Sequence, residues 1–122
     1  MDDAQALLTR LYEAYNRRDL AAFSALLATD VDWPDQIQGG RLIGLDALAA
    51  YWTRNDKMIT VDAAPVSFET RPDGRVAVDV NQIVRNLAGH IWSDSCQRQV
   101  FTLRDDKVAR MDIEFLDKGR EA

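Results

Sequence analysis

The sequence has one cysteine, Cys96, and one histidine, His90. A single cysteine cannot form an internal disulfide, which fits a reducing compartment. Ordinary zinc sites need several cysteine, histidine or acidic ligands, so we expect no metal site. His90 follows the turn-forming pair Ala88-Gly89. We interpret it as a surface histidine and not as a member of a Ser-His-Asp triad. No Lys-Ser/Thr of a phosphate loop follows Gly39-Gly40, and we expect no cofactor.

The chain also lacks a long hydrophobic run and a basic face. No apolar stretch approaches the length that spans a bilayer, and the N-terminus has no basic-then-apolar signal pattern. Lysine and arginine number 15 against 20 acidic residues, for a net charge of -5. Nucleic-acid binding needs a stripe of basic residues to neutralise phosphates. We therefore expect a soluble, cytoplasmic protein that binds neither a membrane nor a nucleic acid.

Length and composition favour one globular domain. The 122 residues fit a single domain, which we place at 1–122, and 47% of them are apolar. A chain of this kind can bury roughly two thirds of the surface that it exposes when unfolded.

The first part of the chain predicts three helices. Apolar residues recur at helical spacing over residues 4–15, and Asp19 is a good cap for a second, short helix. A short extended piece is expected at 31–33, before a proline, and a third helix at about 46–54.

From about residue 58 onward, apolar residues alternate with polar ones, which predicts strands. The first runs over about 58–70 and contains Pro65, which should lie at a sheet edge or a bulge. Further strands are expected at about 76–81, at 91–103 and around 111–115, joined by turns too short for crossovers. The order predicts an α+β fold in which helices cover one face of a mainly antiparallel sheet. Strong curvature of such a sheet would enclose a pocket.

Three segments of the chain resemble one superfamily in pattern and order: LYEAYNRRDLAAFSALLATDVDW at 11–33, GLDALAAYW at 44–52 and VFTLRDDKVARMDIEF at 100–115. They are similar to the nuclear transport factor two-like superfamily, in particular its ketosteroid isomerase-like and SnoaL-like members. The resemblance implies a cone-shaped half-barrel with a deep pocket. It also implies a homodimer that meets through the outer sheet face, around Thr102, Arg110, Asp112 and Glu114.

The resemblance also implies site residues. In ketosteroid isomerases an aspartate base follows the short strand after the second helix, and Asp35 falls at that position. The family's oxyanion-binding tyrosine is replaced by Leu11 and its protonated aspartic acid by Gln99, while Trp52 replaces a supporting tyrosine. The base position matches and the oxyanion hole does not, so steroid isomerisation by that mechanism is not expected.

Each candidate site residue also has a simpler interpretation. Asp35 is either a base that an apolar cavity strengthens, or a solvated turn residue. Gln99 either donates a hydrogen bond to a substrate carbonyl or lies on an exposed face, and its alternation with Phe101 leaves both open. Tyr15 fills the core, and its hydroxyl is a candidate donor. The expected pocket wall comprises Leu11, Trp33, Trp52, Phe101, Met111, Ile113 and Phe115.

Three functions fit this sequence. The first is an enzyme that acts on a small, mostly apolar carbonyl compound by isomerisation, cyclisation or dehydration. In it Asp35 removes a proton next to the carbonyl, and Gln99, Tyr15 or a trapped water holds the enolate oxygen. The second is a non-catalytic module that binds a small hydrophobic ligand or a partner protein. The third, implied by the resemblance, is an epoxide hydrolase-like enzyme.

Overall fold

The computed structural model describes residues 3–36 and 38–117, the last three of these by their backbone alone. Helices and strands follow one another in the order α1 (Asp3–Asn16), α2 (Leu20–Ala25), β1 (Leu27–Pro34), β2 (Arg41–Ile43), α3 (Leu45–Asp56), β3 (Ile59–Thr70), β4 (Val76–Asn86), β5 (Ile91–Arg104) and β6 (Lys107–Asp117). No helix in the described ranges has the length and apolar character to cross a membrane.

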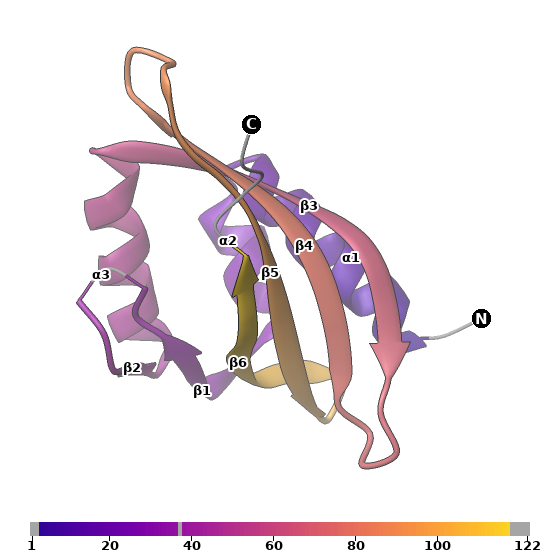
Figure 1. The fold of residues 1–122 in the computed structure, drawn as a ribbon. Helices are drawn as coiled ribbons and strands as arrows, with labels where there is room; N and C mark the ends of the chain where they lie inside the picture. Colours follow the sequence, from indigo (N-terminus) through magenta and orange to yellow (C-terminus); the bar gives the residue numbers. More distant parts are fainter. Residues whose placement is uncertain (1–2, 37, 118–122) are drawn as a thin grey trace.

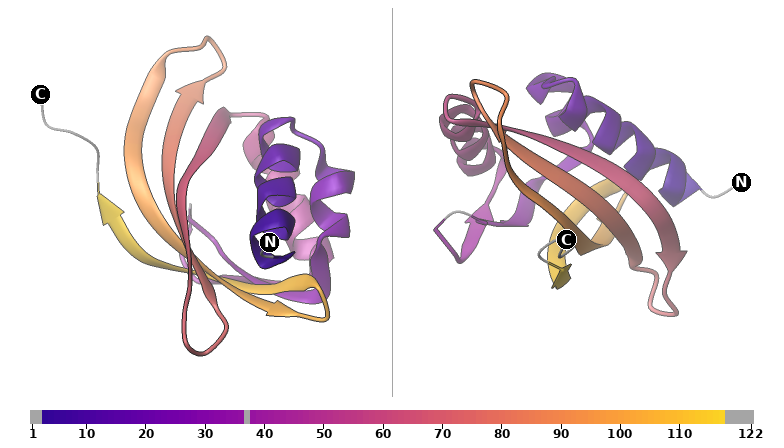
Figure 2. Two further views of the ribbon diagram at one scale, coloured as in Figure 1. Left: turned by 90° about the vertical axis from the view of Figure 1, so that its right-hand side faces the viewer. Right: turned by 45° about the horizontal axis from the view of Figure 1, so that its top comes forward.

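The strands form one six-stranded sheet in the order β2-β1-β6-β5-β4-β3. Neighbouring strands are antiparallel except β1 and β6, which run parallel. The long strands curve strongly, and the helices pack on the concave side of the open sheet (Figures 1 and 2). This arrangement confirms the predicted α+β half-barrel with helices on one face.

The helices form where apolar spacing and caps favour them. In α1 the buried residues are Leu7, Leu8, Leu11, Tyr12 and Ala14, which form one stripe toward the sheet. The carboxylate of Asp19 accepts the backbone N–H of Ala22 at 3.1 Å and so caps α2, as predicted.

Four strands differ from the prediction. β4 continues to Asn86 and β6 begins at Lys107, so both are longer than expected. The extended piece expected at 31–33 is the end of β1, which begins at Leu27, directly after α2. The sequence analysis gave no strand at β2, whose three residues pair with the end of β1. β1 depends on a partner far away in the chain, since it also pairs with β6, whereas β2 depends on pairing with β1 across a short loop. Local alternation carries little information about such pairing.

Strand β3 is an edge of the sheet, and Pro65 lies in it next to a register shift, as predicted. The edge of β3 that has no neighbouring strand is hydrogen-bonded to the last residue of α1. The side-chain amide of Asn16 donates to the carbonyl oxygen of Ala63 at 2.8 Å and accepts the N–H of Ala63 at 2.9 Å. The two hydrogen bonds satisfy a buried residue of the edge strand as a neighbouring strand would.

The outer face of the sheet carries arginine–carboxylate pairs. Arg110 bonds to Asp112 and to Asp32, and Arg71 bonds to Glu114. These side chains are partly exposed, so each pair contributes little to stability.

Candidate functional site

A cavity of about 510 Å³ lies between the helices and the concave face of the sheet. Aromatic side chains make up much of its inner wall. Phe23 packs against Trp52 and Trp33 with ring centroids 4.9 and 5.6 Å apart, and Tyr15 meets Trp52 edge to face at 5.3 Å. Rings in contact hold one another in place, so the wall is a preformed apolar surface.

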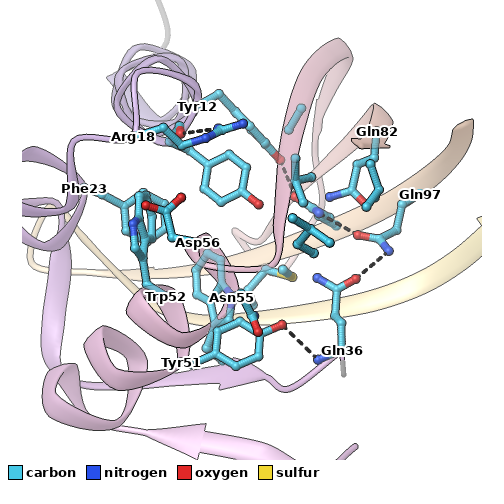
Figure 3. A pocket seen from close by; sticks show the side chains of 18 of the residues that line it. Tyr12, Arg18, Phe23, Gln36, Tyr51, Trp52, Asn55, Asp56, Gln82 and Gln97 are labelled. Carbon is cyan, nitrogen blue, oxygen red and sulfur yellow. Dashed lines mark hydrogen bonds between the residues drawn. The ribbon is translucent and has the colours of Figure 1, made fainter. Parts of the chain in front are cut away.

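A row of hydrogen bonds crosses this wall, and we call its four residues the amide row (Figure 3). The hydroxyl of Tyr12 donates to Oε1 of Gln99 at 2.6 Å. Gln99 Nε2 donates to Oε1 of Gln97 at 2.6 Å, and Gln97 Nε2 donates to Oε1 of Gln36 at 3.0 Å. The amide row therefore runs from a buried tyrosine to an exposed glutamine at the edge of the cavity.

Different elements of the fold position the side chains of the amide row. Gln97 and Gln99 are two residues apart on β5 and so point to the same face of the sheet. Tyr12 follows Leu8 by one helical turn and lies on the buried stripe of α1. Gln36 lies in the loop after β1.

The loop after β1 is closed at Asp35. The N–H of Asp35 donates to the Gly40 carbonyl, and the N–H of Gly39 donates to the Asp35 carbonyl, both at 3.0 Å. The carboxylate of Asp35 accepts the N–H of Gln38 at 2.8 Å. These bonds hold the loop in the turn that directs Gln36 to the cavity.

The polar groups of the cavity are mainly neutral. Burial raises the pKa of Tyr12 well above its ordinary value and raises the pKa of Tyr15 to about 12. Burial also raises the pKa of Tyr51. All three phenols therefore keep their protons at neutral pH. The amides and hydroxyls can exchange hydrogen bonds with a carbonyl or hydroxyl group and cannot neutralise a charge in the interior.

The structure brings most of the predicted site residues to the cavity. Those that line it are Leu11, Tyr15, Trp33, Trp52, Gln99, Phe101 and Met111. Ile113 packs against the core without lining the cavity, and the side chain of Phe115 lies outside the described residues. Asp35 is buried, with 9% of its surface exposed, and lies in the loop beside the cavity without lining it.

Sequence reasoning gave no site role to several residues that line the cavity, among them Tyr12, Gln36, Arg18 and Asp56. Tyr12 had a usable signal, because it lies four residues after Leu8 on an apolar stripe. Gln36, Arg18 and Asp56 are exposed or half-buried polar residues at the ends of elements, where neither periodicity nor spacing reports direction. Within the described residues, no group of three or more His, Cys, Asp and Glu side chains could hold a metal ion.

Comparison with protein families gives one match, to the SnoaL-like domain, over residues 8–111. Comparison with curated proteins gives no match.

Solved structures with the same fold cover nearly the whole chain. A nuclear transport factor two-like protein of unknown function from Burkholderia pseudomallei is 25% identical, with a TM-score of 0.81 over 94% of this chain and 92% of its own. A candidate polyketide cyclase from Xanthomonas campestris is also 25% identical, with a TM-score of 0.79 over 93% and 90%. A Mycobacterium tuberculosis protein in complex with estradiol-17β-hemisuccinate is 12% identical, with a TM-score of 0.81 over 94% and 95%. At 12% identity, the similarity to the Mycobacterium tuberculosis protein shows the fold alone.

Proposed function

The chain belongs to the SnoaL-like domain family, and on that basis we propose that its cavity binds a small, mostly apolar carbonyl compound and promotes its isomerisation, cyclisation or dehydration. The observation that carries this proposal is the amide row within an aromatic wall. Small-molecule sites usually have an apolar wall with a few well-placed polar groups. The volume of this cavity, about 510 Å³, lies in the range that such sites have. The naming of the Xanthomonas protein, which is 25% identical, as a candidate cyclase supports the same class of ligand.

The amide row supplies hydrogen-bond donors for a carbonyl oxygen. Gln97 and Gln99 each use one amide hydrogen within the row, and an amide nitrogen carries two. The second hydrogen can donate to a ligand oxygen, and the Tyr15 hydroxyl can add a further donor. Neutral donors stabilise an enolate less than charged ones, so we expect a modest rate or a substrate with a rather acidic C–H.

Asp35 is our proposed base. Its carboxylate is buried and directly precedes Gln36, the outer end of the amide row. The base would take a proton from the carbon next to the carbonyl while the amide row holds the oxygen. Base and substrate often reach hydrogen-bonding distance only once the substrate is bound, so the test measures the reaction.

Binding can be tested by intrinsic fluorescence, because all three tryptophans of the chain, Trp33, Trp52 and Trp92, line the cavity. Titration with enolisable aryl ketones and with phenols should quench the emission and saturate. Gln99→Leu removes a donor while keeping the volume similar, and should weaken binding of the ketones. Emission that stays constant across the panel would contradict the proposal.

Catalysis can be tested without knowing the substrate. In D₂O, proton NMR follows the loss of the α-proton signals of a bound ketone. We expect exchange faster than in buffer, abolished by Asp35→Asn and retained in Asp56→Asn, which removes the carboxylate that lines the cavity. The reverse pattern would assign the base to Asp56.

A binding module is the second candidate, favoured by the hydrogen bond that already engages the Asp35 carboxylate with Gln38. Saturable quenching with exchange no faster than in buffer would establish it. A homodimer through the outer sheet face and a cytoplasmic location also stay predictions, and light scattering on the purified protein tests the first.

A further inference from the structure

Arg18 brings a positive charge to a largely neutral cavity. Among the described residues that line the cavity, Arg18 is the one basic residue and Asp56 the one acidic residue. In the view of Figure 3, both lie on the side of the cavity away from Gln82 and Gln97. Tyr12, the buried end of the amide row, lies on the same side as Arg18 in that view. An apolar ligand that reaches Gln97 with one end therefore has a cation available for its other end.

The backbone shows that an arginine is unfavourable at this position. Arg18 follows α1 with a φ of 61°, in the left-handed region. The N–H of Asp19 donates to the carbonyl of Ala14 at 3.0 Å, and the N–H of Arg18 donates to the carbonyl of Tyr15 at 3.1 Å. This helix ending favours glycine at the left-handed residue, because any Cβ is strained there. A strained residue that persists points to a use for its side chain.

The Arg18 guanidinium is fixed in place but not fully neutralised. One nitrogen donates to the Tyr15 carbonyl at 3.0 Å, and the group lies 5.8 Å from the centre of the Tyr15 ring. The other terminal nitrogen is 3.4 Å from a carboxylate oxygen of Asp62. Asp62 is shared, since Arg85 approaches its second oxygen at 2.6 Å. Arg18 thus keeps N–H donors for a further partner, and 26% of its side chain is exposed.

Asp56 sets the opposing charge at the mouth of the cavity. It lies at the end of α3 and is exposed, and in the described part of the chain no ion pair joins it to Arg18. Water screens an exposed carboxylate strongly, so it weakens the attraction of Arg18 for an anion without cancelling it.

We propose that Arg18 is a specificity-determining residue that selects ligands carrying a carboxylate or a similar anionic oxygen group at the end remote from Gln97. This inference rests on the proposed function, since it names the class of ligand that the same cavity prefers. The guanidinium would bind the anionic group by charge-assisted hydrogen bonds at the mouth. The neutral interior would hold the apolar body and the carbonyl.

The test compares a carboxylic acid with its uncharged methyl ester. We would titrate the protein with 6-acetyl-2-naphthoic acid and with its methyl ester, following tryptophan emission at pH 7.5 and fixed ionic strength. The wild type should bind the acid about tenfold more tightly than the ester. Arg18→Gln should remove this preference, so that acid and ester bind with similar affinity, while Arg18→Lys should keep part of it.

Three further variants separate the effect of charge from an effect on folding. Arg18→Gly relieves the left-handed strain, so it should melt no lower than the wild type and still lose the preference for the acid. Arg17→Gln removes a neighbouring arginine that does not line the cavity and should behave as the wild type. Asp56→Asn should strengthen binding of the acid.

The outcomes distinguish the two proposals. Equal affinity of the wild type for acid and ester would overturn the role of Arg18 and leave the proposed function standing. A preference for the acid that persists in Arg18→Gln would also overturn that role. Failure of both compounds, together with the rest of the ketone panel, would overturn the proposed function and the inference with it.

Discussion

Replacing Tyr12 by phenylalanine tests whether the amide row is a connected structure. The substitution removes one oxygen from the buried end of the row and keeps the ring that packs edge to face on Phe101, at a centroid distance of 6.1 Å. Gln99 Oε1 then loses its donor while 4% of Gln99 is exposed. Among the described residues, no buried side-chain nitrogen or oxygen lacks a partner, so the variant would create an exception.

The size of the effect follows from burial. A lost hydrogen bond costs about 1 kcal/mol, and an unsatisfied buried acceptor costs about 1–3 kcal/mol. A cavity of about 510 Å³ has room for water, which can partly satisfy Gln99 Oε1. We therefore expect a loss of about 1.5 kcal/mol in the free energy of unfolding for Tyr12→Phe. In a chain of this length that lowers Tm by about 6 °C.

Urea unfolding measures this change, which should lower the midpoint without altering the m-value. Gln99→Leu should cost more, about 2–3 kcal/mol, because both Tyr12 and Gln97 lose a partner. The double variant should lose about 1 kcal/mol less than the sum of the two single variants, which is the coupling between the side chains.

Tyr51→Phe is the matched control. Its hydroxyl accepts the Gln36 N–H at 3.3 Å on the exposed loop, so it should cost no more than about 0.5 kcal/mol. Equal losses for the Tyr12 and Tyr51 variants, or additive losses in the double variant, would refute the reasoning.

Three further predictions concern the structure around the cavity. The three tyrosines have raised pKa values in the folded protein, so the unfolded chain loses their protons at a lower pH. The free energy of unfolding should therefore fall as pH rises from about 10 toward 12, and tyrosinate absorbance at about 295 nm should appear together with unfolding. Asn16→Ala leaves the N–H and the carbonyl of Ala63 without their partners and should cost about 2 kcal/mol in urea unfolding, with faster hydrogen exchange in β3. Leu8→Ala, in the closed core, should cost about 3–4 kcal/mol, whereas Leu48→Ala should cost about 2 kcal/mol because Leu48 already faces the cavity; equal losses would contradict a preformed cavity.

The fold could be predicted where the signal is local. Helical spacing and the cap at Asp19 gave α1 and α2, and Pro65 correctly marked an edge strand with an irregular register. The start of β1 at Leu27 could not be predicted, because no turn residue separates it from α2. The parallel pairing of β1 with β6 depends on contacts between distant parts of the chain, and β2 has three residues, too few to show an alternation, so periodicity reports neither.

The site was harder to predict than the fold for a physical reason. The direction of a polar side chain depends on register, and one bulge reverses it. Alternation in β5 left open whether Gln97 and Gln99 face inward, and the structure places both on the cavity. Position along the chain pointed to Asp35, whereas the turn that it closes directs its neighbour Gln36 to the cavity. Arg18 lies just after the end of α1 and Asp56 is the last residue of α3, and no local pattern encodes the exact geometry of a helix end.

The bond between Asn16 and Ala63 has a consequence for the behaviour of the protein in concentrated solution. An open sheet with a twelve-residue edge strand offers a template on which a second molecule could add a strand and begin to aggregate. Near the middle of β3 the side chain of Asn16 already occupies both hydrogen-bonding groups of Ala63, and two residues later Pro65 has no N–H to offer. The edge is thereby divided into two short stretches. The same contact that joins α1 to the sheet thus also acts against polymerisation of the chain.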